Sequence, residues 1–300
     1  MISVKKYWVM GKEIYFLGFY TTGDGAPDLT KVANEVKERL SKYFTEMFIY
    51  NKETLKQLPN SEDICNVFDE PTDMTYFPYA HKMGYYDWKA FLVDYTINRI
   101  PENSILLYHD MNFEKYPNYW ESDWENIYDV CDKFLKENES DIWAKFELYD
   151  FYLKKSMKTY AIDKVFTDPE QNEVVKNSLQ INSSQVVLKN TKFSKEFAKD
   201  WLYYSRDWDI THPSPNPNRH PESEIIGCPD QDAMQCAIYQ RIFDGRLKPN
   251  FPIYGLHWRV MRHDTIVFNM KGMECKTGPY RLDNNAVLNY FKNKEYEKVF

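Results

Sequence analysis

The chain has 300 residues, 43% of them hydrophobic, which is enough to bury a full core in one large domain or two small ones. Its net charge of −7 argues against a nucleic-acid-binding protein, because such proteins usually carry a strongly basic face. The sequence has no stretch with the roughly 18 apolar residues of a membrane helix, and its first residues lack the apolar region of a signal peptide.

The five cysteines form no CxxC pair, which is typical of reduced thiols, and we therefore expect a cytoplasmic protein. Aromatic residues are frequent, at 17%, with 24 Tyr and 8 Trp. Such rings can serve as stacking platforms for sugars. They can equally well fill a core, or reflect a genome biased toward their codons.

The first part of the chain alternates between strand and helix patterns. Residues 14–20 form an aromatic and apolar run typical of a strand, and a polar turn follows. Beyond Asp28, which is predicted to cap a helix, apolar residues recur at helical spacing as far as Leu40. Residues 47–50 predict a second strand. The sequence has neither a GxGxxG nor a P-loop motif, which disfavours a dinucleotide enzyme or a kinase-like ATPase.

A predicted helix over residues 84–95, stopped by Pro101, leads into the most informative segment. Residues 105–112 read Ile-Leu-Leu-Tyr-His-Asp-Met-Asn, an apolar run that ends in an acid and an amide. Such runs are typical of buried parallel strands, and ligands of open α/β sheets gather just beyond the carboxyl ends of these strands. Asp110 and Asn112 are therefore candidates for holding a metal or a diphosphate.

The candidate metal site needs more oxygens than these two residues supply. A carboxylate and an amide can hold Mg²⁺ or Mn²⁺ if a substrate diphosphate provides further ligands. His257, between two apolar residues, could be a third protein ligand. The alternatives are that Asp110 caps the next turn and that His257 is a hydrogen-bonded core histidine.

The second half of the chain gives less regular patterns. They predict, in order, a helix at about residues 122–135, a helix at 154–166, a strand at 185–188, a helix capped by Ser194, a helix opened by Pro229 and a strand at 265–268. Residues 208–224 hold four prolines and two histidines and predict a long loop, which in a compact domain is usually functional or disordered.

Asp230 lies in the first turn of the helix opened by Pro229, where the helix dipole favours a negative charge. It could simply cap the helix. It could instead accept a proton from a substrate hydroxyl, or hydrogen-bond to that hydroxyl.

Three segments together resemble a known family. Residues 84–89, Gly-Tyr-Tyr-Asp-Trp-Lys, resemble the Gly-Tyr-x-x-Trp-Lys-Pro motif of poorly characterised bacterial and giant-virus glycosyltransferases of the GT-A fold. In that family a helix follows, and then a phrase similar to Ile-Leu-Leu-Tyr-x-Asp-Ala-Gly, whose place residues 105–112 take. Residues 229–232, Pro-Asp-Gln-Asp, resemble a later His-Arg-x-Asp-Gln-Ser phrase that opens a helix. The resemblance spans residues 12–245.

The resemblance implies a GT-A-like α/β/α sandwich with a mostly parallel central sheet in a single domain, residues 1–300. Residues 12–112 would bind the donor, and residues 113–300 would bind the acceptor. The implied activity moves a hexose or pentose from a nucleotide sugar, a UDP-sugar in the first place and a GDP-sugar as the alternative, to a glycan hydroxyl. A divalent ion, Mn²⁺ or Mg²⁺, would assist the departure of the nucleoside diphosphate.

The resemblance also implies roles for individual residues. Those expected at the donor are Thr21, Thr22, Asp24, Tyr86, Trp88, Lys89 and Asp110. Those expected at the metal are Asp110, Asn112 and His257. Asp230 and Gln231 are expected beside the acceptor as catalytic residues, with Asp230 as the base if transfer inverts the anomeric centre and as an orienting group if it retains it.

Two other classes of function remain open from the sequence. One is a metal-dependent hydrolase of phosphoesters or sugar nucleotides that uses His109, Asp110 and His257. The other is a non-catalytic carbohydrate-binding protein that presents its tyrosines and tryptophans to a glycan.

Overall fold

The computed structural model of the chain describes residues 12–23, 26–67, 86–113, 120, 124–137, 139–146, 153, 157–178, 180–211, 229–247 and 290. The strands are β1 (Ile14–Phe19), β2 (Glu46–Tyr50), β3 (Ile105–His109), β4 (Ile142–Phe146) and β5 (Ile181–Lys189). The helices are α1 (Thr30–Leu40), the 3₁₀ turn η1 (Ser41–Tyr43), α2 (Lys52–Leu55), α3 (Glu62–Val67), α4 (Trp88–Ile97), α5 (Ile127–Glu137), α7 (Thr159–Val165), α8 (Pro169–Lys176), α9 (Lys192–Ser205), α10 (Trp208–Thr211) and α11 (Pro229–Phe243).

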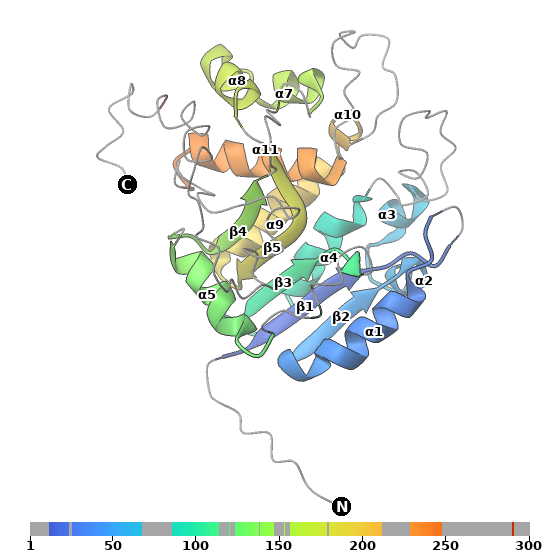
Figure 1. The fold of residues 1–300 in the computed structure, drawn as a ribbon. Coiled ribbons are helices and arrows are strands. Elements are labelled where there is room, and N and C mark those ends of the chain that lie inside the picture. Colours follow the sequence, from blue (N-terminus) through green and yellow to red (C-terminus); the bar gives the residue numbers. More distant parts are fainter. Residues whose placement is uncertain are drawn as a thin grey trace, which may run out of the picture.

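The five described strands form one mixed sheet in the order β2-β1-β3-β5-β4 (Figure 1). β1 pairs in parallel with both β2 and β3, whereas β5 is antiparallel to β3 and to β4. β5 therefore runs against the other four strands. The expected α/β class with a mostly parallel sheet is confirmed at this level, and the sheet takes strands from both of the expected halves of the chain.

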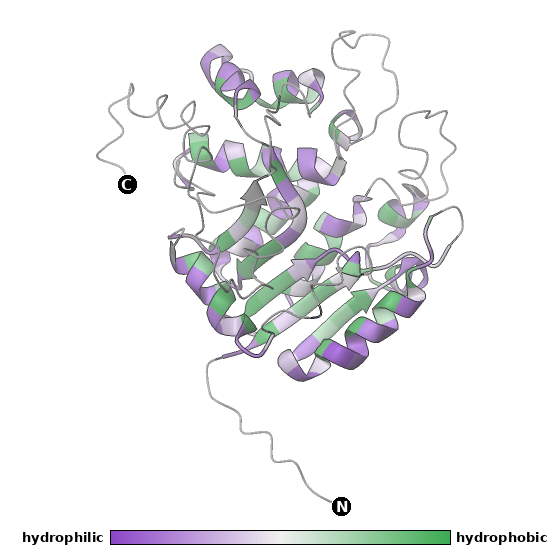
Figure 2. Ribbon diagram, viewed as in Figure 1, coloured by the Kyte–Doolittle hydropathy of each residue, from purple (hydrophilic) through white to green (hydrophobic). Residues whose placement is uncertain are grey.

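Helices cover both faces of the sheet because alternate residues of each strand point to opposite sides. In β1, Tyr15, Leu17 and Phe19 belong to one buried cluster, and Ile14 and Phe16 belong to the other. The first cluster contains the apolar faces of α4, α9 and α11, and the second contains those of α1 and α5. The molecule thus has three layers around the sheet. Figure 2 shows the apolar colour of β1, β2 and β3, and α1 with both polar and apolar residues.

The strongest patterns in the sequence are confirmed. The strands expected at 14–20 and 47–50 are β1 and β2, and α1 buries Val32, Ala33 and Val36 as its spacing predicts. α11 opens at Pro229 and buries its predicted apolar residues completely. None of the described helices is long and apolar enough to cross a membrane.

Both predicted helix caps are displaced. α1 begins at Thr30, with Leu29 at the capping position, and Asp28 accepts a hydrogen bond from the Thr30 amide at 2.9 Å. α9 begins at Lys192 and is capped by Thr191, not by Ser194. Ser194 lies buried in the first turn and its hydroxyl donates to the carbonyl of Asp141 at 3.1 Å, so tertiary contacts take the group that the sequence offered as a cap.

Other predicted boundaries in the second half are also wrong. β5 starts at Ile181, four residues before the predicted strand, and the sequence patterns gave no sign of β4 or α8. Within the predicted helix at 154–166 the structure has α7, which begins at Thr159 after the extended Lys158, and residues 154–156 lie outside the described residues. The loop predicted from residue 208 begins with α10. The strand predicted at 265–268 lies outside the described residues.

Candidate functional site

Polar side chains from four elements converge at the edge of the sheet where β1, β2 and β3 have their carboxyl ends. β3 ends at His109, and the amide of Asp110 donates to the carbonyl of Ser184 in β5 at 2.8 Å. The amino-terminal turns of α4 and α11 reach the same edge, bringing Lys89 and Asp230 beside Asp110. We call Lys89, Asp110, Asp230, Ser183 and Tyr108 the carboxyl-edge cluster.

Lys89 is the centre of this cluster. Its Nζ forms an ion pair with Asp230 Oδ2 and lies 3.3 Å from Asp110 Oδ1. It also donates to the Oγ of Ser183 at 3.1 Å and approaches the carbonyl of the same residue at 3.4 Å. The ring of Tyr108 has its centroid 5.1 Å from Nζ. An ammonium has three N–H donors, so two carboxylates and one serine use its full capacity.

The Lys89 ammonium is held in its charged form although its side chain is only 3% exposed. Burial lowers the pKa of Lys89, but the charges of Asp110 and Asp230 outweigh that effect, and the net pKa is raised. Tyr108 donates its hydroxyl to Asp110 Oδ1, and burial together with that carboxylate raises the pKa of Tyr108 well above its usual value. Lys89 therefore stays a cation and Tyr108 a neutral donor at ordinary pH.

Asp230 is fixed on three sides. Its Oδ2 accepts hydrogen bonds from Lys89 and from the hydroxyl of Ser183, and its backbone carbonyl accepts from the indole Nε1 of Trp201 at 3.2 Å. No described residue is hydrogen-bonded to Oδ1 of this carboxylate. The protein thus orients Asp230 through one carboxylate oxygen and through its backbone.

Asp110 and Asn112 have oxygens that fit a hard divalent ion. Lys89 and Tyr108 both contact Asp110 Oδ1, while the side chain of Asp110 is 31% exposed. Asn112 Oδ1 is buried, and no described residue donates a hydrogen bond to it. A buried amide oxygen without a described donor, two residues along the chain from a carboxylate, is a ligand type that Mg²⁺ or Mn²⁺ accepts. The described residues contain no group of three or more His, Cys, Asp or Glu side chains that could hold a metal, and His257 lies outside them.

The turn that carries these two residues is not extended. β3 ends at His109 and the chain bends at Met111, whose side chain packs beneath Gly18 of β1. A Cβ at position 18 would lie 2.8 Å from the Met111 sulfur, so the glycine leaves room for this bend. The bend, and not strand alternation, sets the relative direction of Asp110 and Asn112.

The loop after β1 uses its own polar groups internally. Thr21 is buried, and its hydroxyl donates to the carbonyl of Pro27. Thr22 forms an isolated bridge with Asp28, so the loop closes back on the start of α1. Asp24 lies outside the described residues. The donor-binding role of this loop remains a prediction.

The aromatic residues expected at the donor flank Lys89. Trp88 is 3% exposed and stacks on Phe19, with the ring centroids 4.0 Å apart, so it supports the edge from within the core. Tyr86 is partly buried, has a positive φ of 64°, and lies with its ring centroid 5.9 Å from Lys89 Nζ. Gln231, expected beside the acceptor, is 8% exposed, and no described residue bonds its Oε1.

His109 does not join Asp110, as the hydrolase hypothesis would need. Because strand residues alternate, its ring lies on the opposite face of the sheet from Tyr108 and is 4.9 Å from the ring of Phe113. Its Nδ1 contacts the backbone carbonyl of Asp110 at 2.7 Å, not the carboxylate. The histidine therefore shapes the turn and is not positioned for chemistry with the Asp110 side chain.

Reasoning from the sequence did not find Ser183 and Tyr108 as members of the cluster. Both belong to strands whose patterns suggested only a core. A signal was present in the run Asn-Ser-Ser-Gln at 182–185, because four polar residues next to an apolar strand are unusual if that end is buried. Three of the four are in fact buried, and Ser183 is completely so.

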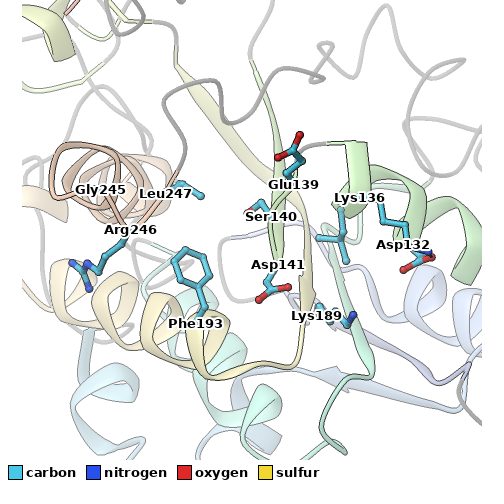
Figure 3. A pocket seen from close by; sticks show the side chains of 11 residues that line it. Asp132, Lys136, Glu139, Ser140, Asp141, Lys189, Phe193, Gly245, Arg246 and Leu247 are labelled. Carbon is cyan, nitrogen blue, oxygen red and sulfur yellow. The ribbon is translucent and has the colours of Figure 1, made fainter. Parts of the chain in front are cut away.

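A cavity of about 810 Å³ lies at the opposite edge of the sheet (Figure 3). Side chains from α5, from the ends of β4 and β5, from α9 and from the end of α11 surround it, among them Lys136, Asp141, Lys189, Phe193 and Arg246. Lys189 pairs with Ile105, the first residue of β3, whereas Asp110 follows the last. The cavity is therefore separated from the carboxyl-edge cluster by the length of β3, roughly 13 Å.

Comparison with known proteins adds no relative to this description. No family model matches the sequence, and no curated protein or solved structure matches the chain significantly. The interpretation of the site therefore depends on its geometry and on the motifs in the sequence.

Proposed function

We propose that this protein is a glycosyltransferase that moves a sugar from a nucleotide-diphosphate sugar to a glycan hydroxyl. The observation that carries the proposal is the ion-pair network of Asp110, Lys89 and Asp230. These three residues come from three separate segments of the sequence that resemble glycosyltransferase motifs. Segments that lie up to 141 positions apart contribute to one cluster at the edge where ligands of α/β sheets bind.

The chemistry needs a carboxylate near the acceptor and a way to stabilise the leaving diphosphate. The acceptor oxygen forms a bond to the anomeric carbon while the bond from that carbon to the diphosphate oxygen breaks, and the acceptor loses its proton. Asp230 Oδ1 can take this proton in an inverting reaction, or orient the hydroxyl in a retaining one. Ser183 and Lys89 fix the carboxylate for either role.

Asp110 and Asn112 are the residues that would hold a divalent ion, with their side-chain oxygens as ligands. When bound, Mn²⁺ or Mg²⁺ would neutralise charge on the departing nucleoside diphosphate. The protein's own contribution is to orient Asp110 through Tyr108 and Lys89, which both contact its Oδ1.

A thermal-shift screen of the full chain against UDP-, GDP- and CMP-sugars, with and without Mn²⁺, tests the donor class. A ligand that binds the native state raises the melting temperature with its concentration. We expect a rise with one nucleotide class and a larger rise when Mn²⁺ is present. Stabilisation by glycans alone, unchanged by nucleotide or Mn²⁺, would instead identify a carbohydrate-binding protein.

Asp110→Asn tests the role of the carboxylate directly. We expect transfer of sugar to fall by about 100-fold or more while the protein stays folded, because a charge needed in the transition state is removed. Asp132→Asn is the matched control, since Asp132 is also partly exposed but lies at the opposite edge, paired with Lys136. Product release without any acceptor would point to a hydrolase, and equal activity in both variants would refute the role of Asp110.

A further inference from the structure

The place between Asp110 and Asp230 is already filled by a positive charge. Lys89 Nζ is in contact with Oδ2 of Asp230 and is 3.3 Å from Oδ1 of Asp110, and the Lys89 and Asp230 side chains are almost completely buried. A divalent ion that joined the two carboxylates would need this same place. The position of Lys89 therefore limits which carboxylate oxygens a metal ion can bind.

We propose that the Lys89 ammonium is the built-in cation of this site: it holds Asp110 and Asp230 together and confines any divalent ion to Asp110 and Asn112, away from Asp230. The inference deepens the proposed function and rests on it for its catalytic meaning. Lys89 is then a positioning residue that acts through the two carboxylates, and not a ligand of the donor phosphates.

The hydrogen bonds of Lys89 support this role. Its three N–H groups are met by Asp230, Ser183 and Asp110, so the ammonium has no donor left for a phosphate oxygen. The ring of Tyr108 covers one side of the ammonium, and Tyr108 also donates to Asp110. The protein therefore surrounds this cation with its own groups.

The charges of the carboxyl-edge cluster also indicate that Lys89 takes the place of a divalent ion between the two carboxylates. Two carboxylates and one ammonium leave the cluster with a net charge of −1, which is a weak attraction for a second cation. Without the ammonium, two carboxylates from β3 and α11 would face one vacant place. Such a pair attracts a divalent ion strongly, because the charges are close and largely shielded from water.

Lys89→Met removes the ammonium but keeps most of the apolar stem, because methionine ends one atom before the lysine Nζ. The probe is Mn²⁺ alone, titrated into the purified full chain without sugar nucleotide and followed by electron paramagnetic resonance or calorimetry. We expect Lys89→Met to bind Mn²⁺ at least about tenfold more tightly than the wild type, which corresponds to about 1.4 kcal/mol. Lys136→Met, which removes an exposed lysine at the opposite edge, should bind Mn²⁺ as the wild type does.

Two further variants separate this role from a merely structural one. Lys89→Arg keeps the positive charge, and we expect it to keep the wild-type affinity for Mn²⁺. Lys89→Met combined with Asp230→Asn removes one charge of each sign, and we expect the extra affinity to disappear. If Lys89→Met is unstable in metal-free buffer, Mn²⁺ should restore its folding, whereas the double variant should fold without it.

Each outcome decides the inference. Unchanged or weaker binding of Mn²⁺ by Lys89→Met overturns it, and so does a Lys89→Met protein that Mn²⁺ cannot stabilise. Tighter binding that persists in the double variant also overturns it, because Asp230 would then not be part of the vacated place. These measurements need no sugar donor, so a failure to find glycosyl transfer leaves them interpretable.

Discussion

Both edges of the sheet carry charged groups, but they hold their ion pairs in different ways. At the carboxyl edge, the side chains of Lys89 and Asp230 are 3% and 6% exposed and touch each other directly. At the other edge, Lys136 is 75% exposed in its pair with Asp132, and the pair of Arg246 with Asp244 is also open to solvent. The pair of Lys89 with Asp230 is buried on both sides, whereas the two pairs at the other edge each have at least one partner open to solvent.

The difference in burial means that the two kinds of ion pair differ in the desolvation free energy lost on folding, which is large for buried charges and small for exposed ones. Exposed ion pairs contribute little to stability, because water screens both partners. A buried ion pair loses its hydration and often stabilises a fold no better than apolar residues of the same size would. A protein that keeps such a pair at the carboxyl edge of its sheet gains little stability from it, which favours a functional reason for Lys89 and Asp230.

Replacing Lys89 or Lys136 should give the largest difference in unfolding free energy between the two edges. In the absence of divalent ions, we expect Lys89→Met to lower the free energy of unfolding by about 3–5 kcal/mol, because it leaves two carboxylates without their buried counter-charge. Lys136→Met should leave the unfolding midpoint unchanged. Urea unfolding followed by tryptophan fluorescence measures both, and equal effects would show that the two edges do not differ in this way.

α11 carries a second buried acid, Asp232, which lies one half-turn beyond Asp230 and is completely buried. Burial raises the pKa of Asp232 well above its usual value, although the ammonium of Lys158 acts in the opposite direction. Asp232 therefore keeps its proton in the folded protein at pH values where the unfolded chain has lost it. Its contribution to stability is present below about pH 4 and is lost as the pH rises toward the folded pKa.

Asp232→Asn should remove this pH dependence. Relative to the wild type, we expect the variant to gain up to about 1.4 kcal/mol of unfolding free energy for each pH unit above about pH 4, until the folded pKa is reached. Urea unfolding of both proteins at several pH values between about 5 and 8 measures the difference. Parallel curves for the two proteins would show that Asp232 is ionised in the folded state over the whole range.

The smallest expected effect compares one serine at each edge. Ser183→Ala removes a buried donor from Asp230 Oδ2, and we expect a loss of about 1 kcal/mol, since a charged acceptor loses a partner. Ser140→Ala removes an acceptor from the amide of Ile142 at 3.2 Å in a partly buried turn, and should cost under about 0.5 kcal/mol. Chemical denaturation measures the loss of unfolding free energy in each variant. A larger loss for Ser140→Ala would contradict the stronger contribution expected from Ser183.

The sequence was a good guide where one face of an element meets the core in a regular way. β1 is an unbroken buried apolar run and α1 shows burial at a period of 3.6, and both were predicted within one residue of each boundary. β5 was only half predicted, because its first four residues include three polar side chains. One of them, Ser183, contacts Lys89 and Asp230 at the carboxyl edge, a contact that no local pattern encodes.

The candidate site shows the same division. The position of Asp110 at the end of a buried strand followed from the pattern of β3, and Asp230 followed from the start of α11. That Lys89 joins the two could not be predicted, because an ion pair between residues 141 positions apart depends on how α4 and α11 pack on the sheet. His109, which the hydrolase alternative joined to Asp110, lies on the opposite face of the sheet from Tyr108, because side chains alternate along a strand.

The sequence by itself determined the α/β class, the main elements of the first half and the two acids of the candidate site. These depend on the spacing of apolar residues and on the residues that begin and end helices and strands. The tertiary structure alone decided that Lys89 lies between those acids, that Ser183 and Tyr108 orient them, and that His109 faces elsewhere. The physical reason is that burial removes charges from water regardless of their distance in the sequence. Their partners are then chosen by the packing of α4, β5 and α11 and not by local pattern.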